Sequence, residues 1–393
     1  MLLQIIFWTG FILMAHSYVL YPMLLQLLVS DGNKQLPDEV SLSAKPPVIV
    51  LMAVYNSKEI IAQKVRSFYD SNYPKEKLYM FVGTDCCNDG TDEMLMKLSA
   101  EFPSLRVIPF QQRSGKIRII NALFAEAKKH PHFNDSILIS TDVTAIFHSD
   151  CVAELVSSFD EEKTGIVGSN IIKGDVNKDG ISGQEKAYYE RELKMKDTEG
   201  QLWGSAMGVF GACFAIRPQA FTPVPDNFLA DDFFITMAAF EKGYNALMNM
   251  QAKVYMNLPN SPLVEYRRKV RISTGNFQNM QRFAALLWPF NARAFAYWSH
   301  KVIRWLGPFF MLGCLLSALA LAPQNVLYYN LFLLQLVAYF IPLVHEMLSR
   351  MGMQIRLFKF ISHFFHMNLG ILVGFFKFLS GVKSSVWEPT RRH

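Results

Sequence analysis

The chain has 393 residues, of which 51% are hydrophobic and 18% are charged. Soluble domains average about 25% charged residues, so this composition excludes a wholly soluble protein. The formal net charge of +6 is modest and no long basic run is present. We therefore expect no nucleic-acid partner, and attribute the charge to basic residues next to a membrane or to an anionic substrate.

Long uncharged runs gather at the two ends of the chain. Residues 2–30 contain no Asp, Glu, Lys or Arg, and no basic residue precedes them. We expect a transmembrane helix over 1–30 and not a cleaved signal peptide. The runs 305–322 and 326–344 are also long enough to cross a bilayer. A third run, 360–376, is marginal and could span the membrane, lie in its interface or re-enter it.

The positive charges set the expected orientation. Lys34 and Lys45 are the basic residues nearest the first run, so the positive-inside rule places the amino terminus outside and the following domain in the cytoplasm. A third C-terminal crossing would break this rule, because it would put Lys383 outside. We expect a multi-pass protein of the inner or plasma membrane. Its five cysteines should be reduced, since Cys86 and Cys87 are adjacent and the others show no paired spacing.

Between the membrane segments, short apolar strands alternate with helices. After a polar linker over 31–46, strands are expected at 48–54, 78–82, 105–110, 136–140 and 165–172. Helices are expected at 58–69, 91–100, 114–129, 151–159 and 180–195, with a further helix ending near 242. This alternation predicts βαβ units, and therefore an α/β fold with a parallel sheet.

Asp142 follows the apolar run 137–139, which suits a strand buried on both faces of such a sheet. Ligands of open α/β sheets bind beyond the carboxyl ends of the strands. A carboxylate at that place can hold a hard cation that bridges phosphate oxygens. A single aspartate after a strand is more often a turn or helix-cap residue, so the assignment depends on the other motifs.

Five motifs follow one another along the chain. They are Ala53-Val54-Tyr55-Asn56, Thr84-Asp85-Cys86-Cys87-Asn88-Asp89-Gly90-Thr91, Arg113-Ser114-Gly115-Lys116, Thr141-Asp142-Val143-Thr144 and Leu229-Ala230-Asp231-Asp232-Phe233. In their order and spacing, the chain from about Pro46 to Arg392 resembles the membrane-bound family 2 glycosyltransferases of polysaccharide biosynthesis. The resemblance implies a GT-A fold, which is a Rossmann-like and mostly parallel sheet in a cytoplasmic domain. It also implies one N-terminal and two to three C-terminal transmembrane helices.

The resemblance implies a binding site for a nucleotide sugar. Tyr55 and Asn56 match the strand end that holds the nucleotide base. Asp85 matches the carboxylate that binds the base edge, and Asp89 matches the second aspartate of the same loop. Lys116 matches the family's Gly-Lys motif and would add a positive charge near the diphosphate. Taken alone, each of these residues would be interpreted as part of a turn or of a solvated helix start.

The chain departs from the family pattern in two of these motifs. Cys86 and Cys87 replace a glycine and a serine of the nucleotide loop, and threonines flank Asp142 where the family has Asp-x-Asp. One or two carboxylates suffice for a divalent cation when phosphates supply the other ligands. We therefore keep Asp142 as the ligand of Mg²⁺ or Mn²⁺, with Thr144 contributing a hydroxyl or a water contact.

Asp232 matches the general base of the family's Thr-Glu-Asp motif. The neighbouring carboxylate of Asp231 and burial against Phe228 and Phe233 would raise the pKa of Asp232 by like-charge repulsion and desolvation. A raised pKa suits a group that takes a proton from an acceptor hydroxyl. The alternative interpretation is an acidic helix start stabilised by the helix dipole.

The family's Gln-x-x-Arg-Trp motif has the weakest match, which is Arg268-Lys269-Val270-Arg271-Ile272. Arg268 and Arg271 keep the spacing and would neutralise the leaving pyrophosphate. The alternative is a basic patch at the membrane surface. The missing Gln and Trp argue against a polymerising enzyme of the cellulose or hyaluronan synthase type.

These assignments divide the chain into a transmembrane helix (1–30), a linker (31–46), a catalytic domain (47–282), an interfacial amphipathic segment (283–300), membrane helices (301–383) and a tail (384–393). The expected function is an inverting transfer of a sugar, preferably from a UDP-sugar, to a lipid-linked or glycan acceptor, with polysaccharide-export proteins as potential partners. Two alternatives stay open. One is a processive polysaccharide synthase, and the other is a non-catalytic assembly partner that only binds the nucleotide sugar.

Overall fold

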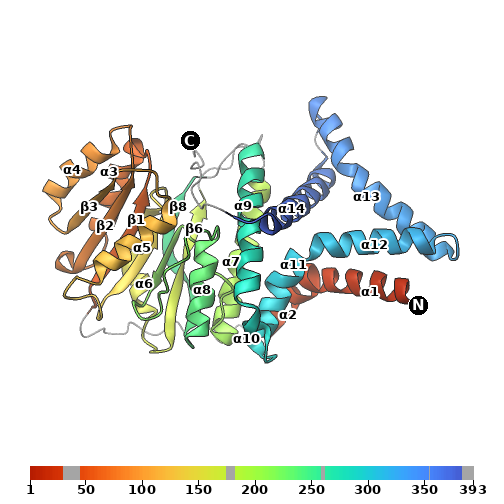
Figure 1. Cartoon of the computed structure of the whole chain (residues 1–393), viewed down its shortest axis with the longest axis horizontal. Coiled ribbons are helices and arrows are strands. Elements are labelled where there is room, and N and C mark those ends of the chain that lie inside the picture. Colours follow the sequence, from red (N-terminus) through yellow and green to blue (C-terminus); the bar gives the residue numbers. More distant parts are fainter. Residues whose placement is uncertain (30–44, 174–181, 258–261, 354, 383–393) are drawn as a thin grey trace. The chain divides into compact units, whose positions relative to one another are not determined.

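The computed structural model describes residues 1–29, 45–173, 182–257, 262–353 and 355–382. By its internal contacts the chain divides into two compact units. The sheet unit consists mainly of residues 28–182 and 186–260, and the helical unit of residues 1–27 and 261–381. Figure 1 shows both, and each is described by itself.

The sheet unit is built on eight strands in the order β3-β2-β1-β4-β7-β6-β8-β5. The strands are β1 (Val48–Val54), β2 (Leu78–Asp85), β3 (Leu105–Phe110), β4 (Ile137–Thr141), β5 (Ile146–Phe147), β6 (Thr164–Lys173), β7 (Cys213–Ile216) and β8 (Asn245–Met256). Strands β3, β2, β1 and β4 are mutually parallel, as is the β6–β8 pair. Strand β7 runs antiparallel to both β4 and β6. The expected α/β sheet with mostly parallel pairing is confirmed.

Strands β5, β7 and β8 were not expected from the sequence. Strand β7 has four residues and lies in the segment Gly204–Arg217, where small residues hide the strand pattern. Strand β8 is longer, but it carries Asn249, Gln251 and Lys253, so it lacks the apolar run of a central strand. Its pairing with β6 is interrupted by register shifts, which agrees with its irregular burial.

Helices cover both faces of the sheet (Figure 1). They are α3 (Lys58–Tyr69), α4 (Thr91–Glu101), α5 (Lys116–Ala127), α6 (Cys151–Ser157), α7 (Ser182–Trp203) and α8 (Asp231–Glu241). Helices α3, α4 and α6 share one apolar core with alternate residues of β1, β2 and β4. Helix α5 packs on the opposite face, where Gly83 of β2 leaves room for Ile119 and Leu123. The expected helices of this region are confirmed, with most ends shifted by one or two residues, whereas the helix expected at 180–195 continues to Trp203.

The helical unit contains helices that could cross a membrane. Its elements are α1 (Leu2–Ala15), a π-helical turn (His16–Leu20), α2 (Tyr21–Leu28), α9 (Pro262–Arg282), α10 (Ala292–Ala296), a second π-helical turn (Tyr297–Val302), α11 (Ile303–Trp305), α12 (Gly307–Leu321), α13 (Val326–Arg350) and α14 (Arg356–Leu379). In the described residues, three helical segments are long and apolar enough to span: Leu2–Leu28, Val326–Arg350 and Arg356–Leu379. The bent pair 292–305 and 307–321, with an angle of 61°, would make a fourth.

Small residues allow close packing within the helical unit. A Cβ atom on Gly10 of α1 would lie 3.0 Å from the Sγ atom of Cys314 on α12. A Cβ atom on Gly374 of α14 would lie 2.6 Å from the Cβ atom of Ser273 on α9. By its contacts α9 therefore belongs with the membrane helices, although the sequence-based division placed residues up to 282 in the catalytic domain. That functional division stays a prediction.

The core position of β4 gives a direct test of the fold. Ile139 is fully buried, so Ile139→Ala should lower the free energy of unfolding by about 2–5 kcal/mol. Met96→Ala on α4 is the matched control, because this side chain is 63% exposed. Its change should stay within about 0.5 kcal/mol. Pulse proteolysis of the full chain in urea and detergent measures both, and equal effects would contradict the burial of β4.

Candidate active site

Polar side chains follow the parallel strands at one edge of the sheet. Val54 of β1 pairs with Thr84 of β2, and β4 lies on the other side of β1 in parallel. Because these strands share a direction, their carboxyl ends meet at one edge, and Tyr55, Asp85 and Asp142 lie there. This is the edge at which ligands of open α/β sheets bind.

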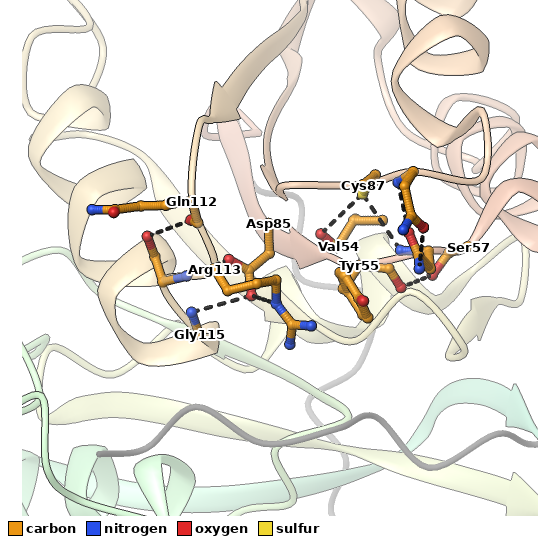
Figure 2. A network of polar contacts seen from close by, with 11 residues as sticks. Val54, Tyr55, Ser57, Asp85, Cys87, Gln112, Arg113 and Gly115 are labelled. Carbon is orange, nitrogen blue, oxygen red and sulfur yellow. Dashed lines mark hydrogen bonds and ion pairs between the residues drawn. The ribbon is translucent and has the colours of Figure 1, made fainter. Parts of the chain in front are cut away.

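Asp85 is held by the segment that leads into α5. Its carboxylate accepts hydrogen bonds from the backbone N–H groups of Ser114 and Gly115, the latter at 3.1 Å, and pairs with Nε of Arg113 at 3.1 Å. The side chain of Asp85 is almost fully buried. Figure 2 shows the contacts of Asp85 with Arg113 and Gly115. Gly115 has φ +81°, a backbone conformation that favours glycine, which explains a glycine at the position before α5. Asp85 therefore fixes the start of this helix.

Arg113 also covers Tyr55. The guanidinium carbon of Arg113 lies 3.5 Å from the centroid of the Tyr55 ring (Figure 2). A guanidinium stacked on a ring and paired with a carboxylate is well ordered and exposes a flat polar surface. The sequence singled out Tyr55 and Asp85, whereas Arg113 was noted only as part of a motif. No local pattern predicts this stacking, because the two residues come from different strand ends.

The loop 84–91 contains a left-handed residue at Cys86. Cys86 has φ +57°, where glycine is unstrained and other residues are disfavoured. Asn56, also left-handed at φ +42°, exchanges hydrogen bonds with Asn88, and its backbone N–H donates to the Sγ atom of Cys87. All five cysteines are free thiols, as expected.

Asp89 acts as a cap for two helices. It accepts hydrogen bonds from the backbone N–H of Lys58 at the start of α3, and from the N–H and hydroxyl of Thr91 at the start of α4. Burial opposes ionisation here, but these hydrogen bonds hold the pKa of Asp89 below its usual value. Its expected part in nucleotide binding stays a prediction, and the contacts give it a structural role.

Lys116 joins the acidic residues of the site. Its Nζ atom lies 3.0 Å from Oδ1 of Asp142 and 3.3 Å from Oδ2 of Asp231. Burial alone would lower the pKa of Lys116, but Asp142 and Asp231 together raise it well above its usual value. This one ammonium group therefore stays charged and connects β4 with the start of α8.

Asp232 faces the same region. Its Oδ2 atom accepts a hydrogen bond of 2.8 Å from the N–H of Gly211, and a Cβ atom on Gly211 would lie only 2.9 Å from that oxygen. Burial raises the pKa of the Asp232 carboxyl, the charge of Asp231 raises it further, and Lys116 acts in the opposite direction. The expected direction of the shift is confirmed.

Strand β7 brings the two halves of the site together. Because it runs antiparallel to β4 and pairs Cys213 with Thr141, the residues before it lie beside the end of β4. The N–H of Asp142 donates to the carbonyl of Ala212 at 2.9 Å. Asp142, Asp231 and Asp232 are thus assembled around Lys116 and Gly211, while Asp85 holds the segment just before Lys116.

In the part of the chain that the structure describes, no group of three or more His, Cys, Asp or Glu side chains gathers as a metal centre. Asp142 is a partly exposed carboxylate at the end of a strand, with Thr144 two residues on. This donor set fits a cation that arrives with a diphosphate, because phosphate oxygens then complete its coordination.

Arg268 and Arg271 lie on α9, in the helical unit, three residues apart as expected for one helix face. Arg268 pairs with the buried Glu265 at 3.0 Å. Their expected contact with pyrophosphate stays a prediction.

A cationic and aromatic cluster beside Asp232 was missed. The Nζ atom of Lys196 on α7 lies 3.5 Å from the centroid of the Phe210 ring, and Phe210 stacks on Tyr189 at 4.2 Å. Lys196 is buried and also lowers the pKa of Asp232. Charged residues occur along the whole of α7, so no pattern in the sequence points to a buried cluster.

Two family profiles match the part of the chain that contains this site. The profile of "Glycosyl transferase family group 2" matches residues 138–344, and that of "Glycosyl transferase family 2" matches residues 49–223. The chain belongs to glycosyltransferase family 2. The two profile matches confirm the family resemblance of its motifs.

Two curated relatives share part of this family 2 chain. The "Probable glycosyltransferase YdaM" of Bacillus subtilis is 22% identical over 61% of the chain and 57% of its own length. The "Beta-monoglucosyldiacylglycerol synthase" of Trichormus variabilis is 27% identical over 31% of the chain and 25% of its own length. The chain thus covers less than two thirds of either relative.

A solved structure confirms the fold class. The "Mannosyltransferase PcManGT" of Pyrobaculum calidifontis, in complex with GDP-Man and Mn²⁺, superposes with a TM-score of 0.67 at 17% identity. The superposition covers 96% of this chain and 99% of that one. The sheet unit therefore has the expected GT-A fold.

The contribution of the Asp89 cap to the free energy of unfolding can be measured. Asp89→Ala should lower the free energy of unfolding by about 1–2 kcal/mol, since it removes hydrogen bonds at two helix starts. Because the pKa of Asp89 is lowered, this contribution is complete above the ordinary carboxyl pKa of about 3.9 and is lost as the pH falls below it. Urea unfolding at two pH values measures the effect. Glu93→Ala, an exposed change on α4, is the control, and an equal loss there would contradict the cap.

Proposed function

We propose that the protein transfers a sugar from a nucleotide-diphosphate sugar to a hydroxyl group of a lipid-linked or glycan acceptor, with inversion at the anomeric carbon. The observation that carries the proposal is the Lys116 ammonium, which contacts both Asp142 and Asp231 beside the raised-pKa carboxyl of Asp232. A phosphate-binding cation and a proton-accepting carboxylate are the two groups that this reaction requires.

The donor would lie along the edge of the sheet. The stacked Arg113 and Tyr55 offer a flat surface for a nucleotide base next to Asp85. The diphosphate would then reach Lys116, whose segment Asp85 holds in place. The Pyrobaculum mannosyltransferase in complex with GDP-Man supports a nucleotide-sugar donor of this class. The loop resemblance favours uridine as the base.

Asp142 and Thr144 would hold Mg²⁺ or Mn²⁺ together with the donor. Such an ion, when bound, would supply positive charge to the departing diphosphate. The Mn²⁺ in the Pyrobaculum complex supports a divalent cation in this fold. Lys116 would supply further positive charge from the protein.

Asp232 would take the proton of the acceptor hydroxyl. The acceptor oxygen then forms a bond to the anomeric carbon while the bond from that carbon to the diphosphate oxygen breaks, which inverts the configuration. The hydrogen bond from Gly211 fixes one carboxylate oxygen, and Asp231 keeps the pKa raised. The reaction needs the deprotonated form of Asp232. As the pH falls, its rate should therefore drop at a pH above about 3.9, the pKa of an ordinary aspartate.

The acceptor is proposed to be a membrane substrate. Among the described residues, three helices could span a bilayer. These helices would anchor the protein to the membrane that carries the acceptor. The name of the Trichormus relative, a glucosyldiacylglycerol synthase, supports a lipid acceptor. Location in the plasma membrane with a cytoplasmic sheet unit belongs to the same proposal.

Removal of the proposed base is the first test. Asp232→Asn should lower the rate of sugar transfer by about 10²–10⁴ while donor binding is retained. Asp226→Asn is the control, because Asp226 forms an exposed ion pair with Arg118 and should leave the rate unchanged. Turnover of nucleotide sugars by the purified full chain measures both. An Asp232→Asn variant as active as the wild type would remove this residue from its role.

Ligand-dependent stability is the second test. A nucleotide sugar at 100 times its dissociation constant should stabilise the chain by about 2.7 kcal/mol, which appears as a higher melting temperature. The shift should require Mn²⁺ or Mg²⁺ and be lost in Asp142→Asn. Stabilisation without transfer to any acceptor would favour the non-catalytic assembly partner, and long products from one chain would favour a processive synthase.

A further inference from the structure

Lys64 is a fully buried charge that the proposed reaction does not use. It lies on α3, on the side facing the sheet, and has 0% exposure. Lysine is rarely buried completely, because removal of the ammonium group from water is costly unless hydrogen bonds replace the lost solvation. The contacts that replace the lost solvation of Lys64 therefore have to be identified.

The ammonium of Lys64 has two hydrogen-bond acceptors, and they flank the loop that begins at Asp142. Its Nζ atom donates to Oγ1 of Thr141 at 2.8 Å and to the carbonyl oxygen of Ala145. It also lies 3.7 Å from the centroid of the Phe147 ring, a favourable cation–π contact. Residues 142–144 form the segment between the two acceptors, so one cation ties both ends of this loop.

The hydroxyl of Thr141 connects Lys64 with the backbone of Ala212, just before β7. A protonated lysine has only donors, so the hydroxyl must accept from Lys64 and can donate to the carbonyl oxygen of Ala212 at 3.0 Å. That carbonyl also accepts the N–H of Asp142, and Ala212 follows Gly211, which binds Asp232. Lys64 thus begins a chain of hydrogen bonds that reaches Asp142, and the backbone link from Ala212 to Gly211 connects this chain with Asp232.

The Lys64 amine is charged at neutral pH although its pKa is lowered. Burial lowers the pKa of Lys64 to about 8, while Cys213, Cys151 and Asp142 act in the opposite direction. The amine therefore stays mostly protonated near neutral pH. The other groups around it are the Phe147 ring, the Thr141 hydroxyl and the two buried thiols, on β7 and at the start of α6.

We propose that Lys64 is a positioning residue that fixes the loop Asp142–Thr144 from inside the core, through Thr141 and Ala145. This inference rests on the proposed function for its effect on catalysis, because that loop is where the diphosphate and its cation are proposed to bind. Its effect on the order of the loop does not depend on any activity.

Hydrogen exchange of the full chain tests the positioning directly. Lys64→Met removes the ammonium but keeps an unbranched apolar stem. The amides of Asp142 and Ala145, which donate to Ala212 and Asp142, should exchange about tenfold faster or more. Amides in the middle of β1 should be unchanged. No acceleration at 142–145, or equal acceleration across the sheet, would overturn the proposal.

Lys75→Met is the matched control. Lys75 also donates to two backbone carbonyls, those of Tyr69 and Ser71, but it is exposed and contacts neither end of the loop. Its loss should leave exchange at 142–145 unchanged. If Lys64→Met does not fold, Thr141→Val carries the same test, because it removes the hydroxyl and keeps the shape. Thr141→Ser, which retains the hydroxyl, should restore slow exchange.

A kinetic arm separates this inference from the proposed function. If the enzyme turns over nucleotide sugar, Lys64→Met and Thr141→Val should raise the KM for the donor by about tenfold or more. The cation concentration needed for half-maximal activity should rise by a similar factor, whereas kcat should change less. Lys75→Met and Thr141→Ser should match the wild type. A wild type without turnover would refute the proposed function, and the exchange data would still decide the role of Lys64. Unchanged donor KM in both loop variants would overturn the catalytic part of the inference.

Discussion

The contact of one lysine with two aspartates unites the site. Lys116 stands at the start of α5, and its Nζ atom lies within 3.3 Å of both Asp142 and Asp231. These carboxylates come from strand β4 and helix α8, which are distant in sequence. Without the ammonium, two acidic groups would face each other beside Asp232, and their repulsion would open the site or protonate one of them. The position of Lys116 depends in turn on Asp85, which binds the backbone just before it.

Much of the first half of the sheet unit could be predicted from the sequence. Strands β1 to β4 are apolar runs that end in polar residues, and the helices between them have a clear apolar period. The aspartates at 85, 142 and 232 were placed by motif, and the structure brings Asp142 and Asp232 together around Lys116 and Gly211. Their functional roles stay predictions, because contacts alone do not show which group binds or reacts.

The sequence could not predict features that depend on tertiary pairing. Strand β7 has four residues in a glycine-rich segment, yet its antiparallel pairing with β4 positions Gly211 against Asp232. Lys64 lies on a helix with many charged residues, and only the loop packed above it reveals that it is buried. The capping by Asp89 was hidden for the same reason, since its partner Lys58 starts a helix some thirty residues earlier.

The cysteine pair in the loop 84–91 has a practical consequence. Cys86 is exposed and sits in a strained left-handed turn beside Asp85, whereas Cys151, Cys213 and Cys314 are buried and Cys87 is half-buried. A thiol-directed fluorophore or cross-linker would therefore attach first at Cys86, next to Asp85. The chain carries its own attachment point for a spectroscopic reporter, so ligand entry can be followed without engineering a new cysteine.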